Sequence, residues 1–268
     1  MTGPNSAPVV REAATVMLLR DSPEGLQTWL LRRVARMAFA GGMSVFPGGA
    51  VDAADAGVDG DELAKAELAT IAGSLGTSVE HATALVCAAI RETFEEVGVL
   101  LTRPSLTMDD QIRAEVEDRT RGFIEVLDAR GLQLAVSSVR PWARWITPEG
   151  ERRRYDTYFF VAAMPDGALA LPATREAVHA DWIGVHAALA EYHAGDRPML
   201  TPTVTALTEL AGFATVAEVL AAAPGRSLVP IAPVLRRTEA GLELDLGNGT
   251  VLPMPDGLTG MPADRDRT

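Results

Sequence analysis

The sequence is poor in two residue types, and each scarcity narrows the classes of protein that it can encode. A single cysteine, Cys87, excludes an intramolecular disulfide framework and a metal site built from cysteines alone. Lysine also occurs once, as Lys65, and acidic side chains outnumber basic ones by 36 to 24, which gives a formal net charge of -12. This balance argues against a non-specific nucleic-acid binder, which carries a basic stripe, and against docking on an anionic membrane.

The 268 residues contain no long uncharged segment. The longest stretch without Asp, Glu, Lys or Arg is Met37 to Val51, which is rich in glycine and too short to span a bilayer. Residues 1–10 lack the features of a secretory signal, and residues 265–268 are not a peroxisomal address. With 47% hydrophobic and 22% charged residues, we expect a soluble cytoplasmic protein, and the single lysine beside abundant alanine is typical of a GC-rich bacterial genome.

Hydrophobic periodicity predicts strands and helices that mix without strict βαβ alternation. We expect a hairpin of two strands at 14–19 and 27–32, strands at 133–146 and 155–163, and a small strand cluster at 231–236, 242–246 and 251–254. We expect helices at 61–73, 77–97, 109–129, 185–192 and 204–222, the last with a break near Gly212. This mixture predicts an α+β fold or a layered α/β sandwich rather than a doubly wound parallel sheet.

The predicted helix from Thr77 to about Val97 has recognisable signals at both ends. Thr77 followed three residues later by Glu80 fits a capping box, and Gly98 supplies a residue that tolerates the left-handed C-cap conformation. Cys87 lies on the apolar side of this helix, so we interpret it as a core residue rather than a nucleophile.

Three glutamates of this helix, Glu92, Glu95 and Glu96, share one face because they stand at i, i+3 and i+4. Like charges at this spacing oppose helix formation by about 0.2–0.5 kcal/mol per pair, so a positive group is expected nearby. A hard divalent cation is one candidate, and the neighbouring Arg91 can hold a carboxylate through a bidentate contact. An acidic triplet alone is more often a solvated helix face. The apolar flanks of this helix and the upstream Phe46-Pro47-Gly48-Gly49 favour a site instead.

Together these residues resemble the signature of the Nudix hydrolase family. That signature is a glycine, five residues, a glutamate, seven residues, and then Arg-Glu-apolar-x-Glu-Glu-x-Gly-apolar. Gly49 matches the opening glycine, and residues 91–99 match the closing half except that Thr93 replaces an apolar residue. Asp55 stands where the first glutamate belongs, and 35 residues separate it from Arg91. The departure puts the role of Asp55 in doubt but leaves the three helix carboxylates in place.

The long insertion is similar to the branch of this family that contains the mammalian peroxisomal coenzyme A diphosphatase. The likeness extends over about residues 12–215. Its segments are Leu30–Arg33, Phe46–Gly49, Ala89–Glu96, Trp142–Pro148, Arg154–Phe160 and Pro202–Thr203.

The resemblance implies a Nudix fold, in which a mixed β-sheet lies between α-helices and a helical insertion interrupts the signature. It implies that Glu92, Glu95 and Glu96 bind Mg²⁺ or Mn²⁺, with the backbone carbonyl of Gly48 as a further ligand and Arg91 among the catalytic positions. A further carboxylate often comes from a late loop in this family. Glu176, six residues before Trp182, has the familiar spacing, and we interpret it as a metal ligand or general base. A single loop glutamate is as readily a solvated residue.

The substrate is less clearly indicated than the chemistry. Coenzyme A diphosphatases have an Arg-x-x-x-Gly-x-x-x-Phe-Pro-Gly-Gly element, and this chain keeps Gly42 and Phe46 but has Ala38 in place of the arginine. The nearby arginines that could bind phosphates instead are Arg32, Arg33 and Arg36. A second basic cluster, residues 152–154, is either a solvated hairpin tip or a phosphate site, in which Arg154 is the best candidate.

The leading hypothesis is a metal-dependent hydrolase of a nucleoside diphosphate linked to another group, with coenzyme A or acyl-coenzyme A as the substrate. The products would be 3′,5′-ADP and 4′-phosphopantetheine or its acyl form. One alternative keeps the chemistry but acts on NADH, ADP-ribose or another dinucleotide. Another is a non-catalytic Nudix domain that binds a nucleotide as a regulator. A small-molecule nucleotide is the expected partner in every case.

The expected organisation is a Nudix domain at residues 12–215 and a C-terminal extension at 216–256 packed on the same domain. The ends, 1–11 and 257–268, are rich in Pro, Gly and charge and are expected to be disordered. The insertion, about residues 56–86, is expected to supply either specificity or homodimer contacts. Trp142 and Trp145 are expected to pack on opposite faces of a strand.

Overall fold

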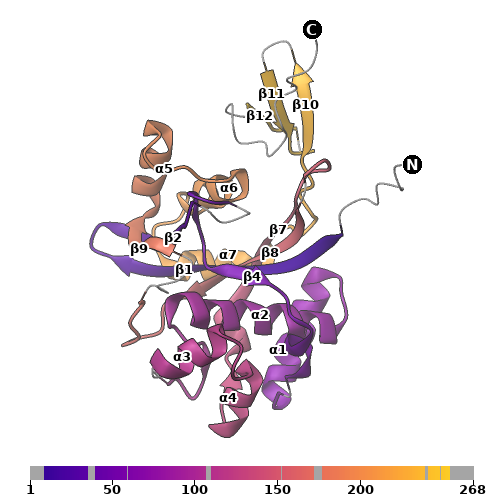
Figure 1. Ribbon diagram of the computed structural model, residues 1–268, viewed down its shortest axis with the longest axis vertical. Coiled ribbons are helices and arrows are strands. Elements are labelled where there is room, and N and C mark those ends of the chain that lie inside the picture. Colours follow the sequence, from indigo (N-terminus) through magenta and orange to yellow (C-terminus); the bar gives the residue numbers. More distant parts are fainter. Residues whose placement is uncertain are drawn as a thin grey trace.

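The computed structural model describes residues 9–35, 40–58, 60–106, 110–151, 153–171, 177–238, 241–247 and 249–253. These residues form three layers, with a mixed β-sheet between two groups of helices (Figure 1). Within the described ranges, no helix combines the length and the apolarity that crossing a bilayer requires. The observed class is therefore α/β with a mixed sheet, as the sequence predicts.

The central sheet has seven strands in the order β3-β2-β1-β8-β7, with β4 paired to β1 and β9 paired to β2. Its strands are β1 (Val10–Ser22), β2 (Gly25–Arg33), β3 (Ser44–Val45), β4 (Gly48–Ala50), β7 (Val139–Ile146), β8 (Arg154–Ala163) and β9 (Ala177–Gly184). Of the pairings in this sheet, only β1 with β8 is parallel. The expected first hairpin is confirmed, since Asp21 pairs with Leu26 across the turn.

Four helices cover one face of the sheet, and the larger of the two apolar cores lies between them and the strands. They are α1 (Glu62–Leu75), α2 (Val79–Val97), α3 (Asp110–Glu117) and α4 (Phe123–Ala129). Short elements accompany them: the 3-10 turns η1 (Ala53–Gly57) and η2 (Val136–Ser138), and the paired strands β5 (Thr102–Arg103) and β6 (Gln133–Leu134). Phe94 and Ile90 of α2 pack against Val16 and Phe160 of the sheet within this core.

The other face carries α5 (Val185–Ala194), α6 (Thr201–Leu210), α7 (Val216–Ala222) and the 3-10 turn η3 (Ala223–Gly225). Beyond them the chain forms a separate antiparallel sheet of β10 (Val234–Thr238), β11 (Gly241–Asp245) and β12 (Val251–Pro253). Leu244 and Leu246 belong to the apolar core on this face, and the rest of the C-terminal sheet projects away from the central sheet (Figure 1).

Several predicted elements have different bounds in the structure. The helix expected at 109–129 is two helices, because Arg119 adopts a left-handed conformation (φ 58°) and interrupts the hydrogen-bond ladder. The strand expected at 133–146 joins the central sheet only from Val139, after β6 and η2. Residues 10 and 11, expected to be disordered, begin β1 instead. Strand β9 was not expected from the sequence, although Val178, Ala180 and Trp182 alternate there with the polar His179 and Asp181.

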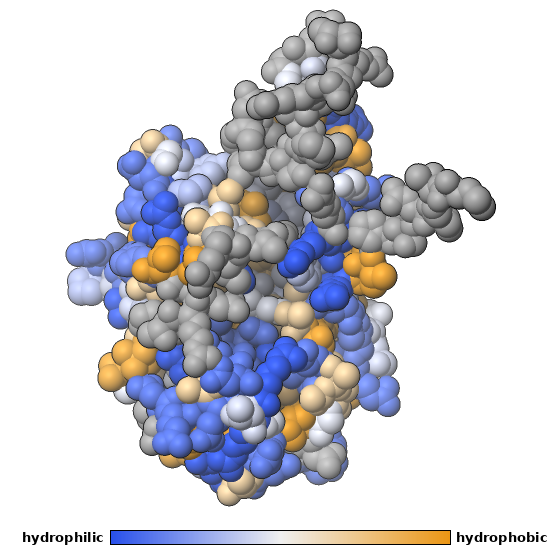
Figure 2. All heavy atoms as spheres, viewed as in Figure 1, coloured by the Kyte–Doolittle hydropathy of each residue, from blue (hydrophilic) through white to orange (hydrophobic). Residues whose placement is uncertain are grey.

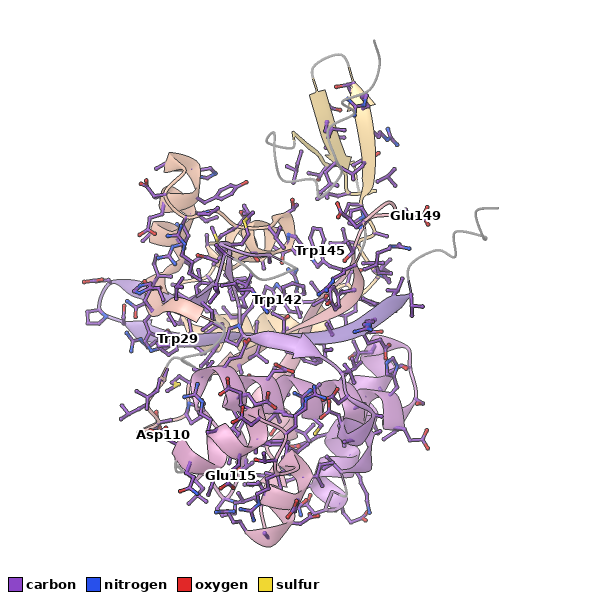
Figure 3. All side chains as sticks on the ribbon, viewed as in Figure 1. Trp29, Asp110, Glu115, Trp142, Trp145 and Glu149 are labelled. Carbon is purple, nitrogen blue, oxygen red and sulfur yellow. The ribbon has the colours of Figure 1, made fainter. Side chains whose placement is uncertain are left out.

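Trp142 and Trp145 lie on the same face of the sheet, contrary to the expectation (Figure 3). Pro141 pairs with Phe160 and Ala143 with Phe159, so Trp142 is an extra residue in a β-bulge. The bulge resets the alternation of side chains, and both indoles therefore enter the core beneath α6 and α7.

Helix α2 begins one residue later than the capping box predicts. Its N-cap is Ser78, whose hydroxyl accepts a hydrogen bond from the backbone N–H of His81, while the hydroxyl of Thr77 contacts the ring of His81. The C-cap is Gly98 in the left-handed conformation, as predicted.

We expect Ser78→Ala to lower the free energy of unfolding by about 1 kcal/mol, because one N–H of the first turn loses its acceptor. Glu80→Ala is the matched control in the same turn and is expected to cost a few tenths of a kcal/mol through the helix dipole. Chemical denaturation of both variants measures the difference. An equal loss in the two would contradict the assignment of Ser78 as the cap.

Candidate active site

The three predicted carboxylates lie on the last two turns of α2, where this helix faces β4 and η1. Thr93, the departure from the apolar signature position, is fully buried and donates its hydroxyl proton to the carbonyl of Ala89, so its polar group is satisfied inside the helix. The apolar side of α2 fixes it against the sheet. Glu92, Glu95 and Glu96 are thereby held at one edge of the core, beside the glycines of β4.

Arg91 is the centre of the hydrogen-bond network at this edge. Its side chain is buried, and Nη1 donates to Glu92 Oε1 at 2.7 Å and to Glu95 Oε1 at 3.1 Å. Nη2 donates to the carbonyl oxygen of Ala50 at 2.9 Å, which joins the helix to β4. The guanidinium therefore orients two of the three carboxylates and fixes the strand beside them.

Asp55 completes this network, and its contacts give it a defined role even though a long insertion separates it from Arg91 in the sequence. Nε and Nη2 of Arg91 donate to its two oxygens at 2.9 and 3.0 Å, and the backbone N–H of Asp52 donates to Asp55 at 2.8 Å. The inserted residues fold as α1, which packs on α2 and returns the chain to the site. Asp55 is thus a positioning residue for Arg91.

Cys87 lies beside Asp55, with Sγ 3.6 Å from Oδ1. Burial raises the pKa of its thiol well above the ordinary value, and the charge of Asp55 acts in the same direction. Both effects oppose the thiolate, so the interpretation of Cys87 as a core residue holds in the structure.

Gly48 and Gly49 allow β4 to approach the carboxylates closely. The N–H of Gly48 donates to Glu96 Oε2 at 2.8 Å. A Cβ on Gly49 would lie 2.5 Å from Glu92 Oε1, and one on Gly48 would lie 2.5 Å from the carbonyl oxygen of Ala14. Residues with side chains cannot occupy either position without moving a neighbour.

Burial opposes the ionised forms of Glu92 and Glu95 more strongly than Arg91 favours them. Burial raises the pKa of Glu92 to about 7 even though Arg91 lowers it, and Glu95 adds to the increase. Burial also raises the pKa of Glu95, against the opposing effects of Arg91 and Arg119. A further cation at this edge would therefore stabilise the ionised forms.

These groups line one wall of a cleft of about 710 Å³. The wall beside α2 consists of the three glutamates with residues 48–50, Glu117 and Arg119. The rest of the lining includes the polar hairpin residues Thr147, Glu151, Arg153 and Tyr155, Thr201–Thr203 at the start of α6, and the apolar side chains of Phe46, Trp145, Ile146, Pro148, Leu200, Pro233, Leu235 and Leu244. Figure 2 shows that the surface over the helices below the cleft is mainly hydrophilic.

Of the predicted phosphate-binding arginines that the structure describes, only some line the cleft. Arg33 lines the cleft, whereas Arg32 points away from it and is exposed. Arg154 is not among the cleft residues, because its Nε donates to the carbonyl oxygen of Thr147 across the β7–β8 hairpin. Arg153, one residue before β8 begins, lines the cleft instead. Glu176, Arg36 and Arg152 lie outside the described residues.

Two arginines near the carboxylates were not expected from the sequence. Arg113 of α3 is buried and donates through Nε to the carbonyl oxygen of Glu95, where a cation complements the C-terminal end of α2. Arg119 is exposed, lines the cleft and pairs with Asp52 at 3.0 Å. Sequence periodicity gives no signal for either, because the Arg113 contact depends on how α3 packs on α2 and the Arg119 contact on how the turn between α3 and α4 folds.

The donor set fits a hard divalent cation in its chemistry, because carboxylate oxygens are the ligands that Mg²⁺ prefers. In the part of the chain that the structure describes, no three His, Cys, Asp or Glu side chains already converge as a metal site. Glu92 and Glu95 face Arg91, and Glu96 faces the N–H of Gly48. A cation would therefore bind at the cleft side of these groups.

We expect Gly48→Ala to destabilise the fold by more than about 2 kcal/mol, because the new methyl group meets backbone atoms of Ala14 and Thr15. Gly49→Ala meets only the end of the Glu92 side chain, which can rotate, and is expected to cost less than about 1 kcal/mol. Thermal and chemical denaturation of the two variants test this order. The reverse order would contradict the close packing of Gly48 against Ala14 and Thr15.

We expect Asp55→Ala to lower the free energy of unfolding by about 3–5 kcal/mol, because it leaves the buried Arg91 without its main partner. Asp61→Ala removes an exposed N-cap acceptor of α1 in the same insertion and should cost about 1 kcal/mol. Urea titration compares the two. A loss for Asp55→Ala no greater than for the control would mean that Arg91 does not depend on this carboxylate.

Comparisons with known proteins agree with this geometry. A family model described as the NUDT19 Nudix domain matches residues 62–210. Two proteins named acyl-coenzyme A diphosphatase NUDT19 are similar to this chain. The human protein is 26% identical over 81% of this chain and 69% of its own length. The Xenopus laevis protein is 26% identical over 90% of this chain and 75% of its own length. A crystal structure of a Nudix hydrolase from Alicyclobacillus acidocaldarius is 25% identical, with a TM-score of 0.66 over 80% of this chain and 96% of that one. The chain is a Nudix hydrolase and belongs to the NUDT19 Nudix domain family.

Proposed function

We propose that this chain is a divalent-metal-dependent diphosphatase of coenzyme A or acyl-coenzyme A. It would cleave the diphosphate bond to give 3′,5′-ADP and 4′-phosphopantetheine or its acyl form. The observation that carries the proposal is the set of three α2 carboxylates that line a cleft together with β4, two of them held by Arg91 and the third by the N–H of Gly48. The substrate class comes from the relatives that carry the name acyl-coenzyme A diphosphatase.

In this proposal, Glu92, Glu95, Glu96 and the backbone carbonyl of Gly48 hold Mg²⁺ or Mn²⁺. A bound divalent cation polarises a phosphoryl oxygen and lowers the pKa of water. The protein's own part is to keep the carboxylates in place: Arg91 orients Glu92 and Glu95, and the N–H of Gly48 holds Glu96. Carboxylates that are not bound to a metal accept the proton of the attacking water, and we assign Glu176 this role or that of a further ligand.

The phosphate groups of the substrate would lie among the arginines of the cleft. Arg33 is the last residue of β2, Arg153 lies in the β7–β8 hairpin, and both line the cleft. They replace Arg32 and Arg154 in our assignment, because those side chains do not line the cleft. A guanidinium suits the 3′-phosphate because it donates paired hydrogen bonds to two phosphate oxygens.

A turnover screen tests the proposal. Coenzyme A, dephospho-coenzyme A, NADH and ADP-ribose are each incubated with the full chain and Mg²⁺ or Mn²⁺, and the products are identified by mass. We expect 3′,5′-ADP from coenzyme A and much slower cleavage of dephospho-coenzyme A. Faster cleavage of NADH or ADP-ribose would keep the Nudix chemistry and overturn the substrate. Binding of these compounds without turnover would favour a nucleotide-sensing regulator.

We expect Glu95→Gln to lower kcat by about 100-fold or more, because the amide cannot supply the negative charge that a metal ligand or proton acceptor requires. Gly49→Ala should lower kcat by about tenfold by displacing the carboxylate of Glu92. Glu80→Gln at the far end of the same helix is the control and should leave kcat unchanged. Initial rates of the three variants on the preferred substrate test these expectations. An unchanged kcat in Glu95→Gln would contradict the assignment of Glu95 as a metal ligand.

A further inference from the structure

The C-terminal sheet, β10–β12, supplies part of the cleft although it follows the Nudix domain in sequence. The family model ends at residue 210, but Pro233, Leu235 and Leu244 line the same cleft as Glu92 and Glu95. Leu235 and Leu244 are register partners on β10 and β11, so they present one apolar patch. The cleft therefore has an acidic wall from the Nudix domain and an aliphatic wall from the extension.

The extension is fixed to the central sheet at two points. The backbone N–H of Ile231 donates to the carbonyl of Arg144 at 2.8 Å, and the N–H of Ile146 donates to Ile231 at 2.9 Å. This bridge lengthens the sheet beyond its edge strand β7. Arg226 also lies over the ring of Trp142 and donates to its carbonyl oxygen. These contacts hold the β10–β12 sheet above the cleft, next to the hairpin that ends near Glu149 (Figure 3).

The chemistry of the aliphatic wall indicates what it contacts. The side chains that β10 and β11 contribute to this wall are aliphatic: Leu235 is partly exposed and its register partner Leu244 is 5% exposed, while the neighbouring Phe46 and Trp145 are 3% and 4% exposed. A flat base is usually bound by stacking on an accessible aromatic ring. Strands β10–β12 carry no aromatic residue, and the partly exposed Tyr155, which also lines the cleft, belongs to β8. An alkyl chain needs only apolar contact area, and each methylene that it buries adds to affinity.

We infer that the β10–β12 sheet is the acyl-recognition surface of the enzyme and that Leu235 is a specificity-determining residue. The inference rests on the proposed function, since it concerns the group attached to the diphosphate that the acidic wall engages. The aliphatic wall then favours substrates with a long acyl chain over free coenzyme A. Selection among substrates comes from the extension, whereas cleavage depends on α2 and β4.

The test compares Leu235→Asp with Val234→Asp in the full chain. Val234 is the preceding residue on β10, is 56% exposed and does not line the cleft, so it places the same charge on the other face of the strand. The substrates are decanoyl-coenzyme A and coenzyme A. We expect the wild type and Val234→Asp to favour the decanoyl substrate about tenfold in kcat/KM, which corresponds to about 1.4 kcal/mol.

Leu235→Asp should remove this preference and leave kcat/KM for coenzyme A within about twofold of the wild type. Equal losses on both substrates, or no change in the preference, would overturn the inference. Leu235 also packs against the core, so Leu235→Ala is measured as well and should reduce the preference about threefold while the thermal midpoint stays close to that of the wild type. A preference that Leu235→Ala leaves intact would count against the inference.

Titration calorimetry without added metal separates this inference from the proposed function. If the wild type hydrolyses neither compound, the proposed function fails. The inference stands if the wild type still binds decanoyl-coenzyme A about tenfold more tightly than coenzyme A and Leu235→Asp loses the difference. If the wild type hydrolyses both compounds equally well and binds them equally, the function stands and the inference fails.

Discussion

The site depends on one buried guanidinium. Arg91 donates hydrogen bonds to the carboxylates of Asp55, Glu92 and Glu95 and to the carbonyl oxygen of Ala50. Three carboxylates this close would repel one another without a cation among them. The planar arginine fork is suited to the task because its donors point in several fixed directions at once, which a lysine could not match. The relative position of α2, β4 and η1 follows from this side chain.

This dependence explains why a long insertion is tolerated within the signature. The contact between Arg91 and Asp55 requires that the two residues meet in space, whatever the length of chain between them. The entropy of closing a loop grows only with the logarithm of its length, and here the inserted residues fold as a helix packed on α2. The aspartate, one methylene shorter than a glutamate, still receives two hydrogen bonds from Arg91 because η1 brings its backbone close.

Much of the fold could be predicted from local patterns. The first hairpin, the span of α2 with its C-cap at Gly98 and the shared face of the three glutamates follow from hydrophobic period, turn residues and helical spacing. What failed depended on tertiary context. The bulge at Trp142 and the break at Arg119 carry no local signal, since a tryptophan and an arginine are ordinary residues in a strand and a helix.

The same distinction applies to the site. Helical spacing predicted that the three glutamates share one face of α2, and in the structure they line one cleft. The sequence favoured Arg154 as the phosphate ligand, whereas Arg153, one residue before β8 begins, lines the cleft, because the side on which a residue lies is fixed only once the strand register is known. The contribution of Leu235 and Leu244 could not be predicted either. Their segment reaches the cleft only because Ile231 pairs with the open edge of β7, and an edge strand offers its backbone groups to any segment that folds back upon it. A domain whose sheet ends in such an edge can therefore gain a new wall for its cleft from a C-terminal extension without change to the carboxylates.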